Sequence, residues 1–208
     1  MSLVSIKRRA EGGVYEAETY EKMDLRSMKG FGSKFTNCLF TDTMLDLSDL
    51  RNCRFDGCTF VSCEVQRAEF SSSFFEETSF HDCNLEQTSF MGCHLAETTF
   101  SDCRMAYGET LFQNATAKKL RFVKCNLHGS NLDFREANGL SFDDSNVWGA
   151  KISLGCAFWN ADFDERTCRR FVAMVARVYP DLETKSKLID LAGDQYPVVE
   201  RAMRETKR

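Results

Sequence analysis

The sequence predicts an all-β repeat protein that ends in a helical tail. Large apolar residues recur every five positions along most of the chain, and a small residue stands two positions before each of them. Helices repeat at 3.6 residues and strands at 2, so neither element alone explains this period. Both prolines, Pro180 and Pro197, lie near the C-terminal end. They mark a tail whose organisation differs from that of the repeat.

The composition argues against several classes of protein. The chain has 208 residues, of which 43% are hydrophobic and 28% charged, with a net charge of −4. A protein that neutralises phosphates is expected to be basic, so direct nucleic-acid binding is not expected. No apolar run is long enough to span a membrane, and the basic residues 7–9 are not followed by the apolar region of a secretory signal. We therefore expect a cytoplasmic protein.

The five-residue period holds without exception from residue 33 to residue 105. The large apolar residues are Phe35, Phe40, Leu45, Leu50, Phe55, Phe60, Val65, Phe70, Phe75, Phe80, Leu85, Phe90, Leu95, Phe100 and Met105. The position two residues earlier, here called the small position, is filled by Ser33, Cys38, Thr43, Ser48, Cys53, Cys58, Cys63, Ala68, Ser73, Thr78, Cys83, Thr88, Cys93, Thr98 and Cys103. Residues two apart point to the same side of an extended segment, so both positions are expected to face inward.

The period continues in both directions with changes of phase. Upstream it passes through Leu25, Tyr20 and Tyr15. Downstream it slips by two residues between Met105 and Phe112, continues to Ile152, and slips by one more to Phe158 and Phe163. Arg135 falls at a small position, where we expect a bulge rather than a buried charge. The two extra residues within 106–111 predict a protrusion with three candidate contact residues, Tyr107, Glu109 and Leu111.

The tail after residue 163 reads as helical. Asp164 is the expected N-cap of a first helix, which Pro180 ends. One face of this helix is apolar and consists of Phe171, Met174, Val175 and Val178. Two further short helices are expected near residues 183–192 and 197–207. A repeat whose apolar residues face inward leaves an apolar surface exposed at its end. The tail is therefore expected to cover that end, to join two copies of the chain, or to do both.

The repeat resembles that of the pentapeptide-repeat family, whose unit is a small residue, a polar residue, Leu or Phe, and two further residues. Cys58-Thr59-Phe60-Val61-Ser62 and Cys83-Asn84-Leu85-Glu86-Gln87 are examples. The resemblance implies an all-β solenoid, a right-handed quadrilateral β-helix in which four units make one square coil. Residues 14–163 are then a rod of about seven coils, residues 1–13 an N-terminal segment expected to be disordered, and residues 164–208 a C-terminal helical cap or dimerisation segment. Relatives that dimerise tail to tail favour a homodimer through these helices.

The residue types used in catalysis and metal binding occur in structural patterns. No Cys-x-x-Cys pair occurs, and nine of the ten cysteines, all but Cys168, fall at small positions. Because Ser, Thr and Ala fill the same positions, we interpret the requirement there as small size and expect free thiols. The three histidines, His81, His94 and His128, fall at outward positions without zinc-finger spacing. No nucleophile elbow, phosphate loop or zinc-protease motif is present. We expect a non-enzymatic protein with no catalytic residue, metal or cofactor.

Charge is unevenly distributed along the predicted rod. Residues 35–105 hold 12 acidic and 4 basic residues, whereas residues 106–163 hold 6 of each. When successive five-residue units are assigned in turn to the four faces of the square coil, two adjacent faces carry seven acidic residues between residues 35 and 105. Arg54 is the single basic residue on these two faces in the same range. These seven, which we call the acidic stripe, are Asp42, Asp56, Glu76, Glu77, Asp82, Glu97 and Asp102. They are the candidate partner-binding residues.

The acidic stripe leads to two hypotheses of different class. The quinolone-resistance members of the family look like acidic rods of DNA-like width, which implies DNA gyrase or topoisomerase IV as the partner of this chain. A negative rod is steered to a basic groove as DNA is. The match is partial, because the long face loops of the best-known resistance members are absent. The alternative is a protein-interaction scaffold or secreted bacterial effector that uses the rod surface and the helical tail.

Overall fold

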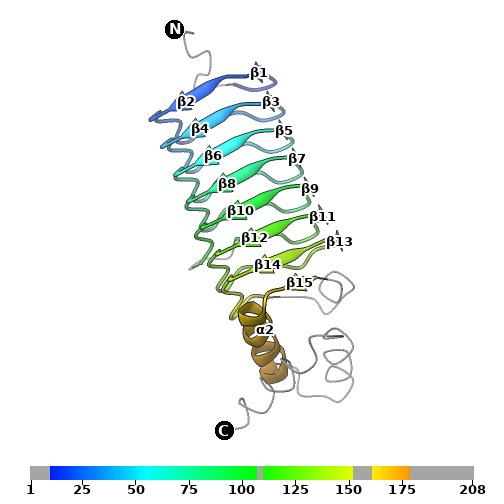
Figure 1. The fold of residues 1–208 in the computed structure, drawn as a ribbon. Helices are drawn as coiled ribbons and strands as arrows, with labels where there is room; N and C mark the ends of the chain where they lie inside the picture. The colour runs from blue at the N-terminus through cyan, green and yellow to red at the C-terminus, as the bar shows by residue number, and fades with distance from the viewer. Residues whose placement is uncertain (1–9, 107–109, 152–160, 179–208) are drawn as a thin grey trace.

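The structure, a computed structural model, describes residues 10–106, 110–151 and 161–178. The described part is a stack of coils with a helix at its C-terminal end (Figure 1). Successive coils contribute three-residue strands to two parallel sheets, and β15 is shorter. Isolated parallel bridges, such as Met44 with Glu64 and Asp49 with Glu69, hold the two remaining faces together. The predicted right-handed quadrilateral β-helix with a helical cap is confirmed.

The two sheets form adjacent faces of the rod. The first strand face has seven strands: β1 (Val14–Glu16), β3 (Lys34–Thr36), β5 (Arg54–Asp56), β7 (Phe74–Glu76), β9 (His94–Ala96), β11 (Thr116–Lys118) and β13 (Glu136–Asn138). The second strand face has eight: β2 (Thr19–Glu21), β4 (Leu39–Thr41), β6 (Thr59–Val61), β8 (Ser79–His81), β10 (Thr99–Ser101), β12 (Arg121–Val123), β14 (Ser141–Asp143) and β15 (Asp162–Phe163).

The pairing register follows the phase of the repeat. Phe35 pairs with Phe55, 20 positions later, and most coils keep this spacing. Phe100 pairs with Phe122 instead, a spacing of 22, which confirms the two-residue slip. Phe142 pairs with Phe163, a spacing of 21, which confirms the further one-residue slip. The expected inward positions of 152–160 lie outside the described residues.

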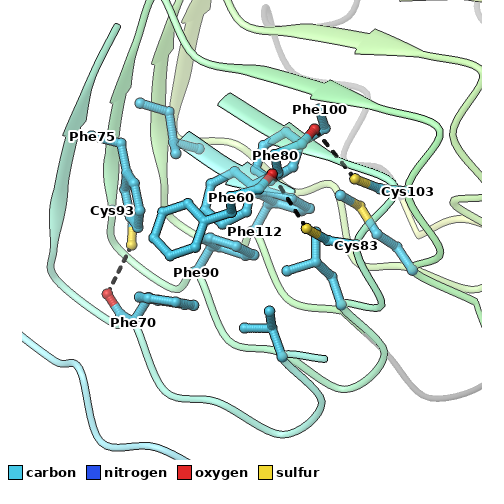
Figure 2. Close-up of a cluster of buried hydrophobic side chains, with 14 of the residues drawn as sticks. Phe60, Phe70, Phe75, Phe80, Cys83, Phe90, Cys93, Phe100, Cys103 and Phe112 are labelled. Atoms are coloured by element: carbon cyan, nitrogen blue, oxygen red, sulfur yellow. Dashed lines mark hydrogen bonds between the residues drawn. The ribbon is translucent and has the colours of Figure 1, made fainter. Parts of the chain in front are cut away.

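The large apolar residues fill the interior and stack from coil to coil. All fifteen positions between residues 35 and 105 are buried, as predicted. The rings of Phe60, Phe80 and Phe100 form a parallel ladder with centroids 4.5 and 4.9 Å apart. Rings from opposite faces meet edge to face, as Phe80 and Phe90 do at 6.1 Å (Figure 2). Both arrangements suit the charge distribution of an aromatic ring.

The small positions donate hydrogen bonds as well as being small. Cys83 Sγ donates to the carbonyl oxygen of Phe60 at 3.6 Å, and Cys93 Sγ donates to that of Phe70 at 3.0 Å (Figure 2). Hydroxyl groups at other small positions do the same: Thr88 Oγ1 lies 2.7 Å from the carbonyl oxygen of Val65. The interpretation that small size alone is required was therefore incomplete.

Along most of the described rod, the chain turns at the residue two positions after a large apolar residue, here called the corner position. In the described ranges, nineteen corner residues other than glycine have positive φ, among them Asp42, Asp82 and Asp102 at 50 to 52°. This left-handed conformation costs an L-residue roughly 1–2 kcal/mol. Backbone pairing between coils opposes that cost: Asp42 N–H bonds to the carbonyl oxygen of Val61 at 3.0 Å, for example. Corner side chains project away from the core, and these three aspartates are exposed.

The unit around Arg135 departs from the pattern. Arg135 is exposed, as expected, and the neighbouring Phe134 is buried. The prediction of a bulge was wrong, because Ala117 still pairs with Ala137 at the regular spacing and no residue is inserted. The chain avoids a buried charge by turning Phe134 inward, where its ring lies 5.6 Å from that of Phe112.

Helix α2 (Glu165–Val178) covers the C-terminal end of the coils. Phe171 is buried and stacks on Phe163 with ring centroids 4.8 Å apart, and Met174 is buried as well. Asp164 Oδ1 accepts the N–H groups of Arg166 at 2.8 Å and Thr167 at 3.2 Å, which confirms its prediction as the N-cap.

The Asp164→Ala variant is expected to lose about 1 kcal/mol of unfolding free energy at neutral pH. Burial acts to raise the pKa of Asp164, but hydrogen bonds from Thr167 and from the Asp144 N–H hold that pKa below its ordinary value. A lowered carboxyl pKa stabilises the fold above the unfolded-state pKa, and this stability is lost as the pH falls through the folded-state pKa. Urea denaturation should therefore show a difference at pH 7 that shrinks as the pH falls below the ordinary aspartate pKa of about 4. A difference independent of pH would contradict this account.

Several predicted features of the tail lie outside the described residues. These are Pro180, the helices near 183–192 and 197–207, and the side chains of Val175 and Val178. The domain limits after residues 13 and 163 stay predictions. Within the described residues, the structure contains no helix that is long and apolar enough to cross a membrane.

Candidate partner-binding surface

The acidic stripe follows the two strand faces and their corners. Asp56 and Glu76 end strands β5 and β7 on the first strand face. Glu77 and Glu97 occupy the corner that leads from this face to the second strand face. Because consecutive coils are in register, each pair lies in a column parallel to the axis of the rod.

The remaining three residues of the stripe form a column on the far corner of the second strand face. They are Asp42, Asp82 and Asp102, which directly follow β4, β8 and β10. Ser62 occupies the same column between Asp42 and Asp82, and its Oγ donates to Asp82 Oδ2 at 3.1 Å. The second strand face is thus bordered by carboxylates along both edges.

Ion pairs reduce the charge of the stripe on the first strand face. Arg54 Nε lies 2.7 Å from Asp56 Oδ2, and Arg54 Nη2 lies 2.9 Å from Glu76 Oε2. Lys34 Nζ lies 3.9 Å from Asp56 Oδ2 as well, and the Asp56 side chain is half-buried. Exposed pairs of this kind contribute little to stability, but they leave less negative charge for a partner.

The corner carboxylates are more available. Asp42 and Glu77 are exposed and form no ion pair within the described part of the chain. Asp102 is exposed too, and its Oδ2 lies 3.7 Å from His81 Nδ1. Glu97 is paired: Lys119 Nζ donates to its Oε1 at 2.7 Å, and this hydrogen bond lowers the pKa of Glu97.

A basic coil follows the acidic stripe on the same faces, and the sequence-based reasoning did not recognise it. Lys118, Lys119, Arg121 and Lys124 are all exposed and lie within seven consecutive residues. Lys119 continues the column of Glu97, and Lys124 continues the column of Asp102. Following each column across the two-residue slip would have revealed this change of sign.

The predicted protrusion is only partly described. Tyr107 and Glu109 lie outside the described residues. Leu111 belongs to the regular stack, where it bridges Ser89 and Asn131. Thr110 is buried and fills the small position before Phe112, so the inserted residues precede it. The assignment of this insertion to partner binding stays a prediction.

The histidines lie on different faces of the rod. His81 on β8 is exposed and lies 2.9 Å from Ser101 Oγ. His94 on β9 is exposed, and its ring stacks on that of Phe74 with centroids 4.6 Å apart. His128 is half-buried on a third face. No group of three or more His, Cys, Asp or Glu side chains among the described residues could hold a metal ion.

The described cysteines are buried, free thiols. Burial raises the pKa of Cys53 to about 11 and that of Cys93 to about 12. Hydrogen bonding to the neighbouring thiol of Cys83, together with burial, raises the pKa of Cys63. The thiolate is the reactive form, so these three thiols are chemically quiet in the folded protein. A hydrogen bond with Cys58 instead lowers the pKa of Cys38 to about 7.

The candidate cap and dimer residues divide into two groups. Phe171 and Met174 are buried within a single chain, so they serve the cap and are not exposed to a second copy. The side chains of Val175 and Val178 lie outside the described ones, and a homodimer through the C-terminal helices stays a prediction.

Comparisons with known proteins agree with this architecture. Residues 32–109 match the family model described as the pentapeptide repeat region. Among solved structures, a trypsin-treated form of QnrB1, a plasmid-mediated fluoroquinolone resistance protein, matches with a TM-score of 0.58 at 14% sequence identity. The match covers 83% of this chain and 93% of that chain, and at this identity it shows the fold alone.

A second solved structure is HetL, a pentapeptide repeat protein involved in heterocyst differentiation regulation from the cyanobacterium Nostoc sp.. The match covers 74% of this chain and 87% of the HetL chain, with 11% sequence identity and a TM-score of 0.29. That score is too low to support an argument. No curated protein sequence matches the chain.

Proposed function

We propose that this chain, whose residues 32–109 match the pentapeptide repeat region, is a non-enzymatic binding protein whose acidic stripe engages a cationic, DNA-binding protein. Type II topoisomerase, either DNA gyrase or topoisomerase IV, is the proposed partner. The outcome would be protection of that enzyme from quinolones or modulation of its supercoiling activity. The observation that carries the proposal is the pair of acidic corner columns along the second strand face.

Electrostatics supports this choice of partner class. Corner carboxylates on a rigid rod present fixed negative charge at regular intervals, as a duplex does with its phosphates. Such an arrangement accelerates the encounter with a basic groove and discriminates against acidic surfaces. The fold likeness to QnrB1, itself a fluoroquinolone resistance protein, adds a precedent for the architecture. Resistance activity in this chain remains part of the proposal.

A supercoiling assay tests the proposal. Purified gyrase is assayed with and without ciprofloxacin, in the presence and absence of this protein at micromolar excess. We expect the protein to restore supercoiling in the presence of the drug, or to reduce it without the drug, and to do so less at high salt. No effect under any of these conditions would remove gyrase as the partner, and the same assay with topoisomerase IV relaxation covers the second enzyme.

Two matched variants show which surface is responsible. The corner variant carries Asp42→Asn, Glu77→Gln, Asp82→Asn and Asp102→Asn. The opposite-face variant carries Asp46→Asn, Glu64→Gln, Glu69→Gln and Glu86→Gln, which lie on the other two faces. Both lose four negative charges, so they have the same net charge. We expect only the corner variant to lose the effect on gyrase, and equal losses would contradict the role of the stripe.

The scaffold alternative uses the rod surface together with the helical tail, and much of that tail lies outside the described residues. In the described part, Phe171 and Met174 pack onto the end of the rod and leave no free apolar face of their own.

A further inference from the structure

We propose that the second strand face is a docking surface for a cationic α-helix of a protein partner, which lies along the axis of the rod with its carboxyl end towards the basic coil. This inference rests on the proposed function in one respect, namely that the rod acts by binding a cationic protein. It does not depend on the identity of that protein.

The floor of the proposed surface carries no carboxylate, lysine or arginine over four consecutive coils. Strands β4, β6, β8 and β10 present only hydroxyl, apolar and imidazole side chains outward. These are Leu39, Thr41, Thr59, Val61, Ser79, His81, Thr99 and Ser101. A flat floor of this kind allows close approach of a partner without the desolvation of a fixed charge beneath it.

The edges of the same surface carry the negative charge. Glu77 and Glu97 occupy one edge, and Asp42, Asp82 and Asp102 occupy the other. At the level of β8 and β10, four of these carboxylates surround the neutral floor, two on each side. A partner that fits must carry positive charge on both flanks and a less charged ridge between them.

The dimensions of the surface suit an α-helix. A three-residue strand is about 10 Å long, and a helix with its side chains is about 10–12 Å wide. From Asp42 to Asp102 there are three steps between coils of about 4.8 Å each, or about 14 Å. That length corresponds to about ten helical residues, nearly three turns. Each flank of such a helix can carry a row of lysine or arginine residues with the spacing i, i+3, i+4 and i+7. One row would then contact each edge of the surface.

The basic coil ends this surface and gives it a direction. At the step from β10 to β12, three of the four outward columns of the face acquire a positive charge, and the fourth, in which Val123 follows Ser101, stays neutral. Glu97 is followed by Lys119 on one edge, Thr99 by Arg121 on the floor, and Asp102 by Lys124 on the other edge. A uniformly cationic groove that runs the full length of the rod would be repelled here.

The charge pattern of a helix matches this reversal. The carboxyl end of a helix carries a partial negative charge and the amino end a partial positive one. A cationic helix therefore binds with its carboxyl end beside Arg121 and Lys124, and with its amino end towards Asp42. The opposite orientation places like charges together at both ends.

A synthetic peptide serves as the probe. It has about sixteen residues, a helical sequence with arginine and lysine on two flanks, an acetylated amino end and a free carboxylate. Fluorescence anisotropy with the full-length protein is expected to show binding that the corner variant weakens by about tenfold or more, while the opposite-face variant stays within about twofold. Equal weakening by both variants, or by neither, would overturn the proposed surface.

A second peptide of the same length and charge, with its residues reordered and prolines in place of two alanines, tests the helical requirement. It has the same charge but cannot form the helix. We expect it to bind at least about tenfold more weakly, since the spacing of its charges no longer matches the two edges. Equal affinity would overturn the helix as the occupant.

Direction is measured with a nitroxide on either end of the helical peptide. A label at the carboxyl end should broaden the amide signals of residues 119–124 in the protein, and a label at the amino end those near Asp42. The reverse pattern, or broadening of both regions by both labels, would overturn the orientation. If the peptide binds but the gyrase assay is negative, the topoisomerase is removed as the partner and the docking surface remains. If the protein affects gyrase, the corner variant does not, and the peptide fails to bind, the helix docking surface is removed and the proposed function remains.

Discussion

Replacement of Phe75 by alanine is expected to lower the free energy of unfolding by about 3–5 kcal/mol. Phe75 is 1% exposed, its ring stacks on that of Phe55 at 5.0 Å, and it meets Phe70 edge to face at 5.5 Å. The change removes a large buried apolar surface and leaves a cavity that packed neighbours fill only in part. In a stack of coils, each coil contacts only the coils beside it, so the cavity weakens both of its interfaces. Chemical denaturation followed by circular dichroism measures the loss.

The adjacent residue provides the control. Phe74 is 44% exposed, on the outer side of the same strand, where its ring stacks on that of His94. Phe74→Ala removes the same atoms but almost no core packing, so we expect a loss of about 1 kcal/mol or less. Similar losses for both variants would mean that burial does not alternate along β7 as the repeat predicts.

The repeat could be predicted from the sequence because burial in this fold depends on position within five residues. Phe35, Phe80 and Met105 need no knowledge of distant residues to be assigned to the interior. The corner conformation is different. Leu47 has positive φ although its type disfavours that region, and it does so because pairing between coils outweighs local propensity. Such cooperative effects are not visible in a single pentapeptide.

The break in the repeat shows a second limit. The five-residue period assigns Arg135 to the interior and gives no reason to choose Phe134 in its place. The choice depends on the packing of Phe134 against Phe112 in the preceding coil. Periodicity identifies that a unit is irregular, but the packing of a neighbouring coil decides how the irregularity is resolved.

The candidate surface was predicted in outline only. Column membership follows from the 20-residue spacing, so Asp82 and Asp102 could be assigned to one column from the sequence. The contacts of Arg54 with Asp56 and Glu76 depend on side-chain conformation across two coils. The charge reversal at Arg121 is not apparent from the 20-residue spacing, because the two-residue slip moves each later charge into a different column.

Replacement of Ser73 by alanine is expected to lower the free energy of unfolding by about 1–3 kcal/mol. Ser73 is fully buried; its Oγ accepts the N–H of Cys53 at 2.9 Å and donates to the carbonyl oxygen of Leu50 at 2.9 Å. Alanine is small enough for the position but leaves both backbone groups without this partner, away from water. Urea denaturation of the two proteins measures the difference.

Ala68, the natural alanine at another small position, shows why a loss of stability is expected at Ser73 in particular. Ala68 has no donor in its side chain, yet the carbonyl oxygen of Leu45, one coil earlier, already accepts the N–H of Ser48 at 3.1 Å. At Leu50, the corresponding N–H, that of Cys53, bonds to Ser73 Oγ instead. The hydroxyl group of Ser73 therefore satisfies two backbone groups at once.

A cysteine variant separates the requirement for a donor from the requirement for small size. Ser73→Cys places a thiol between Cys53 and Cys93 in the same column, where both thiols donate to backbone carbonyl oxygens at 3.0 Å. We expect it to lose about 1 kcal/mol or less, since the donor is kept. If Ser73→Ala were as stable as the wild-type protein, size alone would govern the small position. If Ser73→Cys lost as much as Ser73→Ala, the hydroxyl oxygen as an acceptor for the Cys53 N–H would be the deciding group.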